Sequence, residues 1–327
     1  MECNNCQVNE LKIEFKVEGD SNIPLLAGVL EHLKRRDILV DAKGNTFIVK
    51  ESDVRDFIDF SHDHMDASQI TYRISKQPWE PMEKIDEVLD VKWIDEVIKK
   101  QLMICHYQPI VDIEEQVFAY ELLARFPKED GSMIYPNEIF SAAKARGRLY
   151  SLDRACRMTA VKHATSLKGK KAFINFIPTS IYSPEFCLKS TTALAEELGI
   201  DPVQLVFEVV ETEKVEDIEH LKKILAFYKE KGFEYALDDV GEGYSTMEML
   251  ADIKPNYMKL DMKYVQGISN DLNKQAVAQK FLEKAVEVGS IPLAEGIEER
   301  EDFEWLKETG YKLFQGYYFG KPVAAPI

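Results

Sequence analysis

The chain has 327 residues and carries 41 lysines and arginines against 57 aspartates and glutamates, a formal net charge of −16. So acidic a chain excludes DNA and RNA as partners, because neutralising phosphates requires clustered Lys and Arg, and it excludes docking on anionic lipid. No apolar run approaches the roughly 20 residues that span a bilayer, and no basic segment followed by an apolar core opens the chain. The five cysteines have no framework spacing, so we expect a cytoplasmic protein.

Residues 1–95 are predicted to form a small α+β module. Alternating apolar and polar residues predict three strands, at residues 11–17, 45–50 and 70–76. Helical spacing predicts two helices, at residues 23–36 and 52–65. Residues 76–90 contain two prolines and many charges, so we expect a linker that runs into a helix. No motif here indicates a ligand, and a regulatory role is an expectation from architecture alone.

Residues 96–327 repeat one pattern, in which short apolar runs alternate with longer amphipathic ones. There are eight apolar runs, at residues 103–111, 117–124, 171–176, 204–210, 233–240, 256–262, 290–296 and 312–319. Eight βα units over roughly 225 residues predict an α/β fold of the TIM-like (β/α)8 barrel type, which typically needs about 250. Only residues 112–116 separate the first two runs, too few for a crossover helix. We therefore expect a hairpin there, with an antiparallel first strand.

Seven of the eight runs carry polar residues at or near their ends, and these are Glu121, Asn175, Glu208, Asp238 with Asp239, Lys259, Glu295 and Gln315. Taken singly, a glutamate in a strand usually faces solvent, and a pair of aspartates usually forms a turn or a helix cap. Barrel active sites, however, are assembled from side chains at the carboxyl ends of the strands. The joint pattern therefore predicts one polar site at the mouth of the barrel.

The charges of this predicted site indicate metal ions. The five carboxylates sum to −5, and Lys259 brings the cluster to −4. Two divalent cations would balance it, whereas bare carboxylates 4 Å apart repel by about 4 kcal/mol per pair. Oxygen ligands suit Mg²⁺ or Mn²⁺, and two such ions clamp a phosphoester for in-line attack. The residues alone indicate a metal-dependent barrel enzyme of a kind that suits a phosphoesterase.

The same motifs resemble the EAL family of cyclic di-GMP phosphodiesterases. They occur in order between Tyr107 and Pro322, and they are YQPIVD, ELLAR (Glu121 to Arg125) for the family's E-A-L-x-R, INF, FEVVE, DDVGEGYS, KLD, AEGIEE and QGYYF. The resemblance implies a barrel with an antiparallel first strand. It also implies hydrolysis of cyclic di-GMP to linear pGpG with two Mg²⁺ or Mn²⁺ ions.

The resemblance further implies a role for each matched residue. Glu121, Asn175, Glu208 and Asp238 would bind one metal, and Asp238, Asp239 and Glu295 the second. Lys259 would contact the attacking water. The implied catalytic residues are Lys259, Glu121, Asp239 and Glu295. Arg125 and Gln315 would contact substrate phosphate or ordered water, with Glu298 as an outer partner. Glu211 would brace the loop after the aspartate pair. A homodimer through the barrel helices near that loop is also implied.

Three positions depart from the family pattern. Leu122 replaces the alanine, Ile177–Pro178 follow INF where Ser or Asn is common, and DDVGEG places Val240 and Glu242 where the family has Phe and Thr. Glu242 adds a negative charge beside a site for a dianion and would lower turnover if it points inward. A catalytically silent cyclic di-GMP receptor, or a protein-interaction domain, is therefore the alternative. An unrelated metal-dependent lyase is a more distant one.

A second possible metal site lies elsewhere in the chain. Cys3 and Cys6 have CxxC spacing, and His62 with His64 could complete a zinc site. No second CxxC occurs and the histidines are far away in the sequence, so a terminus without metal is the favoured interpretation.

Overall fold

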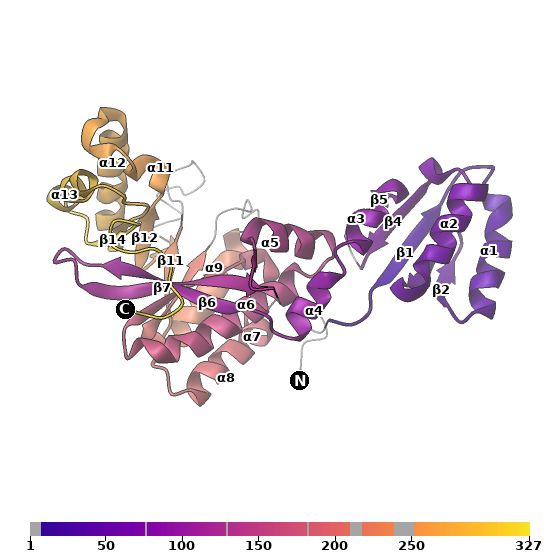
Figure 1. The fold of residues 1–327 in the computed structure, drawn as a ribbon, viewed down its shortest axis with the longest axis horizontal. Coiled ribbons are helices and arrows are strands. Elements are labelled where there is room, and N and C mark those ends of the chain that lie inside the picture. Colours follow the sequence, from indigo (N-terminus) through magenta and orange to yellow (C-terminus); the bar gives the residue numbers. More distant parts are fainter. Residues whose placement is uncertain (1–7, 76, 129, 182, 210–217, 239–251) are drawn as a thin grey trace. The chain divides into compact units, whose positions relative to one another are not determined.

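The computed structural model describes residues 8–75, 77–128, 130–181, 183–209, 218–238 and 252–327. The chain divides into two compact units, and Figure 1 labels their elements. Unit 1 comprises Met1–Leu102 and Tyr135–Leu152, and unit 2 comprises Met103–Ile134 and Asp153–Ile327. Across the described residues, no helix combines the length and apolar character needed to cross a membrane.

Unit 1 is built on an antiparallel sheet of order β2-β3-β1-β4-β5. Its strands are β1 (Lys12–Val17), β2 (Leu39–Lys43), β3 (Thr46–Lys50), β4 (Ile70–Ile74) and β5 (Glu80–Pro81). Its helices are α1 (Ile23–Arg35), α2 (Val54–His64), α3 (Ile85–Leu89), α4 (Trp93–Lys99) and α5 (Pro136–Ala145). The three predicted strands and two predicted helices are confirmed. β2 escaped prediction because four of its five residues are exposed and show no apolar alternation.

The core of unit 1 forms where the apolar side chains of the strands pack against the apolar side chains of the helices. Phe15 of β1 stacks on Phe47 of β3, and Phe57 of α2 packs edge-on against both rings. The described part of the expected linker, residues 77–90, joins this core. They contain β5 and α3, and they bury Met82, Ile85 and Val88 with the residues of the sheet. The expected helix is confirmed as α3, but the expectation of a linker is wrong, because the apolar residues among these charges pack in the core of the sheet.

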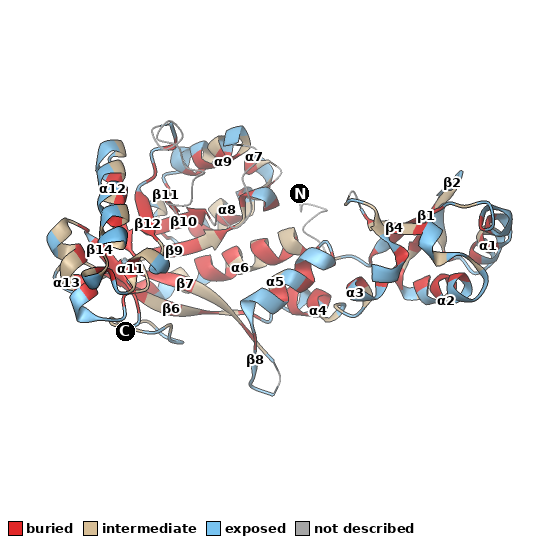
Figure 2. Cartoon of the chain, turned by 90° about the horizontal axis from the view of Figure 1, so that it is seen from above, coloured by how far each residue is buried: buried red, intermediate tan, exposed pale blue. Residues whose placement is uncertain are grey.

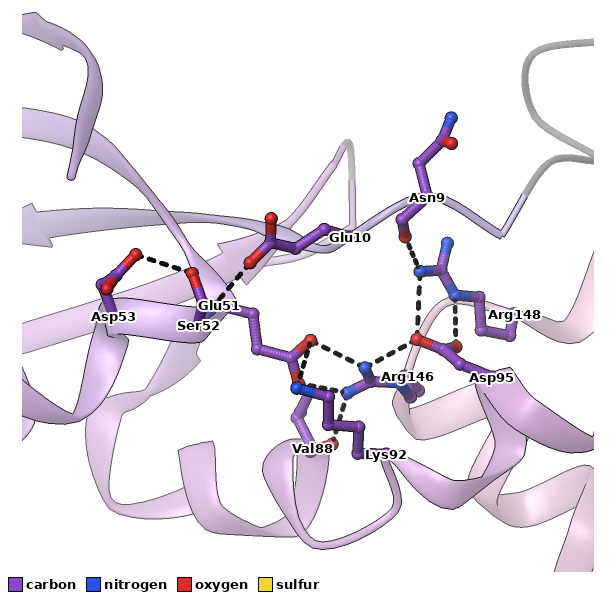
Figure 3. A network of polar contacts seen from close by, with 10 residues as sticks. All are labelled: Asn9, Glu10, Glu51, Ser52, Asp53, Val88, Lys92, Asp95, Arg146 and Arg148. Atoms are coloured by element: carbon purple, nitrogen blue, oxygen red, sulfur yellow. Dashed lines mark hydrogen bonds and ion pairs between the residues drawn. The ribbon is translucent and has the colours of Figure 1, made fainter. Parts of the chain in front are cut away.

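A buried ionic network ties residues after α5 to the rest of unit 1 (Figure 3). Arg146 is 0% exposed, forms two 2.8 Å hydrogen bonds to the Glu51 carboxylate and one of 2.7 Å to Asp95 of α4. Arg148 donates to Asp95 over 2.8 Å and to the backbone carbonyl of Asn9. Residues 135–152 thus fold with unit 1, although they lie between strands of unit 2 in the sequence.

Unit 2 is a closed barrel of eight strands within the described residues. They are β6 (Ile104–Val111), β7 (Val117–Pro127), β9 (Lys171–Phe176), β10 (Leu205–Val209), β11 (Glu234–Leu237), β12 (Tyr257–Leu260), β13 (Ile291–Ala294) and β14 (Leu313–Gln315). The order is β6-β14-β13-β12-β11-β10-β9-β7, and β6–β7 pairing closes it. The short strand β8 (Met133–Ile134) pairs antiparallel with the end of β7. Each strand coincides with one of the eight predicted runs.

The predicted hairpin is confirmed, because β6 runs antiparallel to both of its neighbours. Its register with β7 places Gln108 opposite Glu121. The remaining neighbours, from β7 through β9 to β14, are parallel. Parallel strands direct all their carboxyl ends to one mouth.

Helices cover the outside of this barrel. They are α6 (Leu149–Ala164), α7 (Pro184–Cys187), α8 (Lys189–Glu197), α9 (Ile218–Glu230), α11 (Met262–Val265), α12 (Leu272–Val288) and α13 (Arg300–Thr309). Strands β10 and β12 are buried along their whole length (Figure 2). A charged side chain on such a strand needs a partner inside the barrel.

Candidate functional site

The polar residues predicted at the strand ends do converge, as far as the structure describes them. Glu121 lies on β7, Asn175 on β9, Glu208 on β10, Lys259 on β12 and Gln315 on β14. Asp238 and Glu295 directly follow β11 and β13. Contacts join them into two groups, which are Glu121 with Asn175 and Gln315, and Lys259 with Glu208, Asp238 and Glu295. The two groups are adjacent, because Asn175 is opposite Glu208 in the sheet. Asp239, Glu211, Val240, Glu242, Cys3 and Cys6 lie outside the described residues.

Glu121 is held by two side-chain amides. The Asn175 Nδ2 group donates to its Oε1 over 2.8 Å, and the Gln315 Nε2 group donates to its Oε2 over 2.7 Å. Burial by itself raises the pKa of Glu121, but the charge of Lys259 and the hydrogen bonds from Gln315 and Asn175 outweigh it. The net pKa lies below its ordinary value, so Glu121 stays ionised.

Lys259 is the buried cation of the site. Its Nζ lies 2.7 Å from Glu208 Oε1 and 3.5 Å from Asp238 Oδ1, and it contacts Glu295 Oε1. Burial lowers the pKa of Lys259, whereas the charges of Asp238, Glu208 and Glu121 raise it by more, so the pKa is above its ordinary value. One ammonium thus partly neutralises several carboxylates.

Glu208 behaves differently from Glu121, although both are buried glutamates. Its side chain is 0% exposed. Burial raises its pKa well above the ordinary value, and the charges of Glu121 and Asp238 add to the rise, while Lys259 opposes it. Of the two glutamates, Glu208 is therefore the one whose ionisation depends more on a nearby cation.

The donor chemistry of the site fits a hard divalent cation. No group of three or more His, Cys, Asp or Glu side chains poised around a metal position occurs among the described residues, which exclude Asp239. Two buried oxygens, Glu208 Oε2 and Gln315 Oε1, nevertheless lack a hydrogen-bond donor there. Buried oxygens without donors are costly, and carboxylate and amide oxygens are the ligands that Mg²⁺ and Mn²⁺ prefer.

Two predicted residues lie away from this cluster. Arg125 follows Glu121 by four residues on β7, hence on the same strand face but about 13 Å further along, and its Nη1 donates to the carbonyl of Ala124 over 2.9 Å. Glu298 is exposed and accepts a 3.2 Å hydrogen bond from Gln266. Sequence reasoning missed Asp153, a buried carboxylate on α6 that contacts the residues after β9. The signal that could have found it is an Asp and an Arg four residues apart on one predicted helix.

Comparison with known proteins identifies the same barrel. Residues 91–322 match the EAL domain family. The chain is 30% identical over 226 residues to the probable cyclic di-GMP phosphodiesterase PdeG of Escherichia coli, and the match covers 66% of this chain and 44% of PdeG. It is 25% identical to the E. coli cyclic di-GMP phosphodiesterase PdeR, over 73% of this chain and 37% of PdeR. The chain thus spans less than half the length of these curated relatives.

Solved structures are similar as well. A standalone versatile EAL protein from Vibrio cholerae O395, in its c-di-GMP bound form, matches with a TM-score of 0.61 and 35% identity, over 68% of this chain and 94% of that one. The FimX EAL domain from Pseudomonas aeruginosa, bound to c-di-GMP, has a TM-score of 0.66 at 20% identity, over 73% and 97%. The second likeness concerns the fold alone. Because the family match covers most of the chain, the protein belongs to the EAL domain family.

Proposed function

We propose that the chain hydrolyses one phosphodiester bond of cyclic di-GMP and releases linear pGpG. The observation that carries the proposal is that one EAL-type barrel holds Glu121 bonded to the Asn175 amide and, on neighbouring strands, Glu208 paired with Lys259. The curated relatives PdeG and PdeR are named for this activity, and the similar V. cholerae protein carries c-di-GMP. An acidic mouth accepts a dianion once cations reverse its local charge.

The residues that would hold two Mg²⁺ or Mn²⁺ ions are Glu121, Asn175, Glu208, Asp238, Asp239 and Glu295. When bound, such ions polarise the phosphate and generate the nucleophilic hydroxide. Asn175 and Gln315 orient the Glu121 carboxylate through their amides. They do so without ionising, which keeps the oxygens of Glu121 directed into the site at any pH near neutrality.

Lys259 supplies the fixed positive charge. Because its pKa is raised by the surrounding carboxylates, it remains an ammonium and can steady the water and the negative charge that develops on phosphorus. Water adds to phosphorus, the P–O3′ bond breaks, and a proton passes to the departing 3′ oxygen. Arg125, on the same face of β7, would bind a phosphate of the substrate.

Chromatography of the products tests the proposal. Purified protein is incubated with cyclic di-GMP and Mg²⁺ or Mn²⁺, with and without EDTA. We expect pGpG only with metal, and a loss of at least about 100-fold in Glu121→Gln. Glu283→Ala, which changes an exposed glutamate of α12, is the control and should retain activity. Tight binding without pGpG would instead support the silent receptor, and full activity of Glu121→Gln would refute the site.

Two further proposals concern organisation. Residues 1–95 would form the regulatory module and residues 96–327 the catalytic domain, in a cytoplasmic homodimer. Light scattering at micromolar concentration tests the dimer, since a mass near 37.6 kDa would refute it. If a signal changes the activity of the whole chain, loss of that effect after deletion of residues 1–95 would support the regulatory role.

A further inference from the structure

A further buried carboxylate, outside the proposed site, contacts the residues that follow the strand carrying Asn175. Asp153 is on α6 and is 4% exposed. Its Oδ1 accepts a 2.9 Å hydrogen bond from the backbone N–H of Ile177, and its Oδ2 accepts one of 2.7 Å from the Ser180 hydroxyl. The Arg157 guanidinium, one helical turn later, donates to the same Oδ2. All these residues belong to unit 2.

The two accepted bonds hold both ends of one short turn. β9 ends at Phe176, and the 3₁₀ turn Pro178–Ser180 follows at once. Up to Phe176 the strand is paired with β10, where Asn175 is opposite Glu208. The next N–H, that of Ile177, is bound by Asp153. The carboxylate thus continues the hydrogen bonding of the strand by one residue and sets the direction in which the chain leaves it.

The direction of the chain matters because Asn175 is two residues before Ile177. Its side-chain amide donates to Glu121 over 2.8 Å. A tilt of the strand end would turn this amide away from the Glu121 carboxylate, since a misplacement of about 1 Å already breaks a well-aligned hydrogen bond. Asp153 is therefore connected to Asn175, a residue of the proposed site, through the backbone of Ile177.

Packing of α6 against its neighbours does not by itself require the ion pair between Asp153 and Arg157. Arg157 is 2% exposed, and its Nε also donates to Thr191 of α8 over 3.2 Å. A buried ion pair can often be replaced by apolar side chains without loss of stability. The Asp153 carboxylate does more than pair with Arg157, however, because its two oxygens accept from a backbone N–H and a hydroxyl at once.

We propose that Asp153 is a positioning residue, which orients Asn175 toward Glu121 by fixing the turn that leaves β9. Its activity readout rests on the proposed cyclic di-GMP hydrolysis, whereas its structural readout does not. Ser180→Ala is the informative variant, because it removes one of the two turn contacts and leaves the Asp153–Arg157 ion pair in place.

The matched control is Ser290→Ala. Ser290 is as buried as Ser180, at 6% against 7% exposure, and its hydroxyl donates to the carbonyl of Pro255. It precedes β13 and therefore lies at the amino end of the strands, away from the mouth. The two variants delete the same group from equally buried places, so both should lose similar stability in urea.

The primary readout is the side-chain amide signal of Asn175 in metal-free protein labelled with ¹⁵N-asparagine, identified by its loss in Asn175→Asp. We expect the signal to shift in Ser180→Ala and in Asp153→Asn, and to stay in place in Ser290→Ala. The kcat for cyclic di-GMP should fall about 3- to 30-fold in Ser180→Ala, with KM within about twofold. In Ser290→Ala both constants should stay at the parent values.

Two outcomes would overturn the proposal. An unmoved Asn175 signal in Ser180→Ala would show that the turn does not orient the amide. A shifted signal with parental kcat in an active enzyme would show that the orientation is irrelevant to the reaction. If the parent protein does not hydrolyse cyclic di-GMP, the proposed function fails by itself, and the Asn175 signal alone decides whether Asp153 positions it.

Discussion

Lys259 Nζ and Glu208 Oε1 lie 2.7 Å apart inside the barrel, with side chains 2% and 0% exposed. They come from β12 and β10, two strands separated in the barrel by β11. A buried ion pair contributes little net stability, but removing one partner strands the other charge at a cost of about 3–5 kcal/mol. The pair therefore makes the interior of the site dependent on its cation.

Lys259→Met is expected to destabilise unit 2 by about 3–5 kcal/mol in EDTA, because Glu208, Asp238 and Glu295 lose their common cation. Urea unfolding measures the loss. Adding Glu208→Gln should restore at least about 1 kcal/mol, since the stranded carboxylate is then neutral. Lys171→Met is the control. Its pair with Glu234 is partly exposed, so a loss of about 1 kcal/mol is expected. Equal losses in the two lysine variants would contradict the interpretation.

Mg²⁺ is expected to raise the melting temperature of EDTA-treated protein, because a cation that binds only the folded state stabilises it. At 100 times Kd the gain is about 2.7 kcal/mol. Glu208→Gln should show a much smaller rise, since an amide replaces a carboxylate whose Oε2 lacks a hydrogen-bond donor among the described residues. Differential scanning calorimetry checks both. An equal rise in parent and variant would exclude Glu208 as a ligand.

Arg146→Met is expected to cost unit 1 about 3–5 kcal/mol, because Glu51 and Asp95 are buried and lose the guanidinium that pairs with both. Arg35→Met removes an exposed pair with Glu31 and should cost less than about 1 kcal/mol. Unfolding followed by tryptophan fluorescence in a Trp305→Phe background reports unit 1, which holds Trp79 and Trp93. Similar losses of stability in Arg146→Met and Arg35→Met would refute the stabilising role of the network in unit 1.

A fragment of residues 91–327, which begins where the family match begins, lacks some of the partners of Arg146 and Arg148 in that network. It retains Asp95 but lacks Glu51 and Asn9. We expect faster hydrogen–deuterium exchange over residues 136–152 than in the whole chain, because Arg146 then carries one partner carboxylate less. Unchanged exchange there would show that this segment folds independently of the first 90 residues.

The stability of unit 1 should depend on pH through Asp95. Burial raises its pKa, but hydrogen bonds from Arg146 and Arg148 outweigh burial and hold the pKa below the ordinary value. A depressed carboxyl pKa contributes stability above the unfolded value of about 3.9, and this stability is lost as the pH falls through the folded value. The gap in urea midpoint between parent and Asp95→Asn should therefore be largest near pH 7 and shrink below about pH 4. Asp41→Asn, at an exposed position, should show no such change.

Local patterns were enough to predict most of the barrel. Each of its eight strands coincides with a run of apolar residues, and the five residues between the first two runs exclude a crossover helix. Carboxyl ends of parallel strands share one mouth, so the convergence of Glu208 and Lys259 could also be predicted. The linker expected at residues 76–90 was wrong, because proline and charge density says little about what a distant sheet covers.

Contacts between residues distant in the chain could not be predicted from any comparable pattern in the sequence. Arg146 occurs in a run that reads like an exposed helix end, yet it is fully buried against Glu51, 95 residues earlier. Asp153 likewise gave no period or spacing that indicates the backbone of Ile177 as its partner. Such pairs are selected by the packing of elements distant in the chain, and hydrophobic periodicity does not encode them.

The sequence by itself determined the barrel, its antiparallel first strand and the chemical types gathered at its mouth, because strand alternation and loop length are local properties of the chain. Only the tertiary structure decided what each charge does there. Glu121 and Glu208 are the same residue in similar strands, yet Lys259 and two amides lower the pKa of Glu121, whereas burial beside other carboxylates raises the pKa of Glu208. The reason is physical, since a pKa depends on the surrounding dielectric and charges, which exist only once distant strands have met.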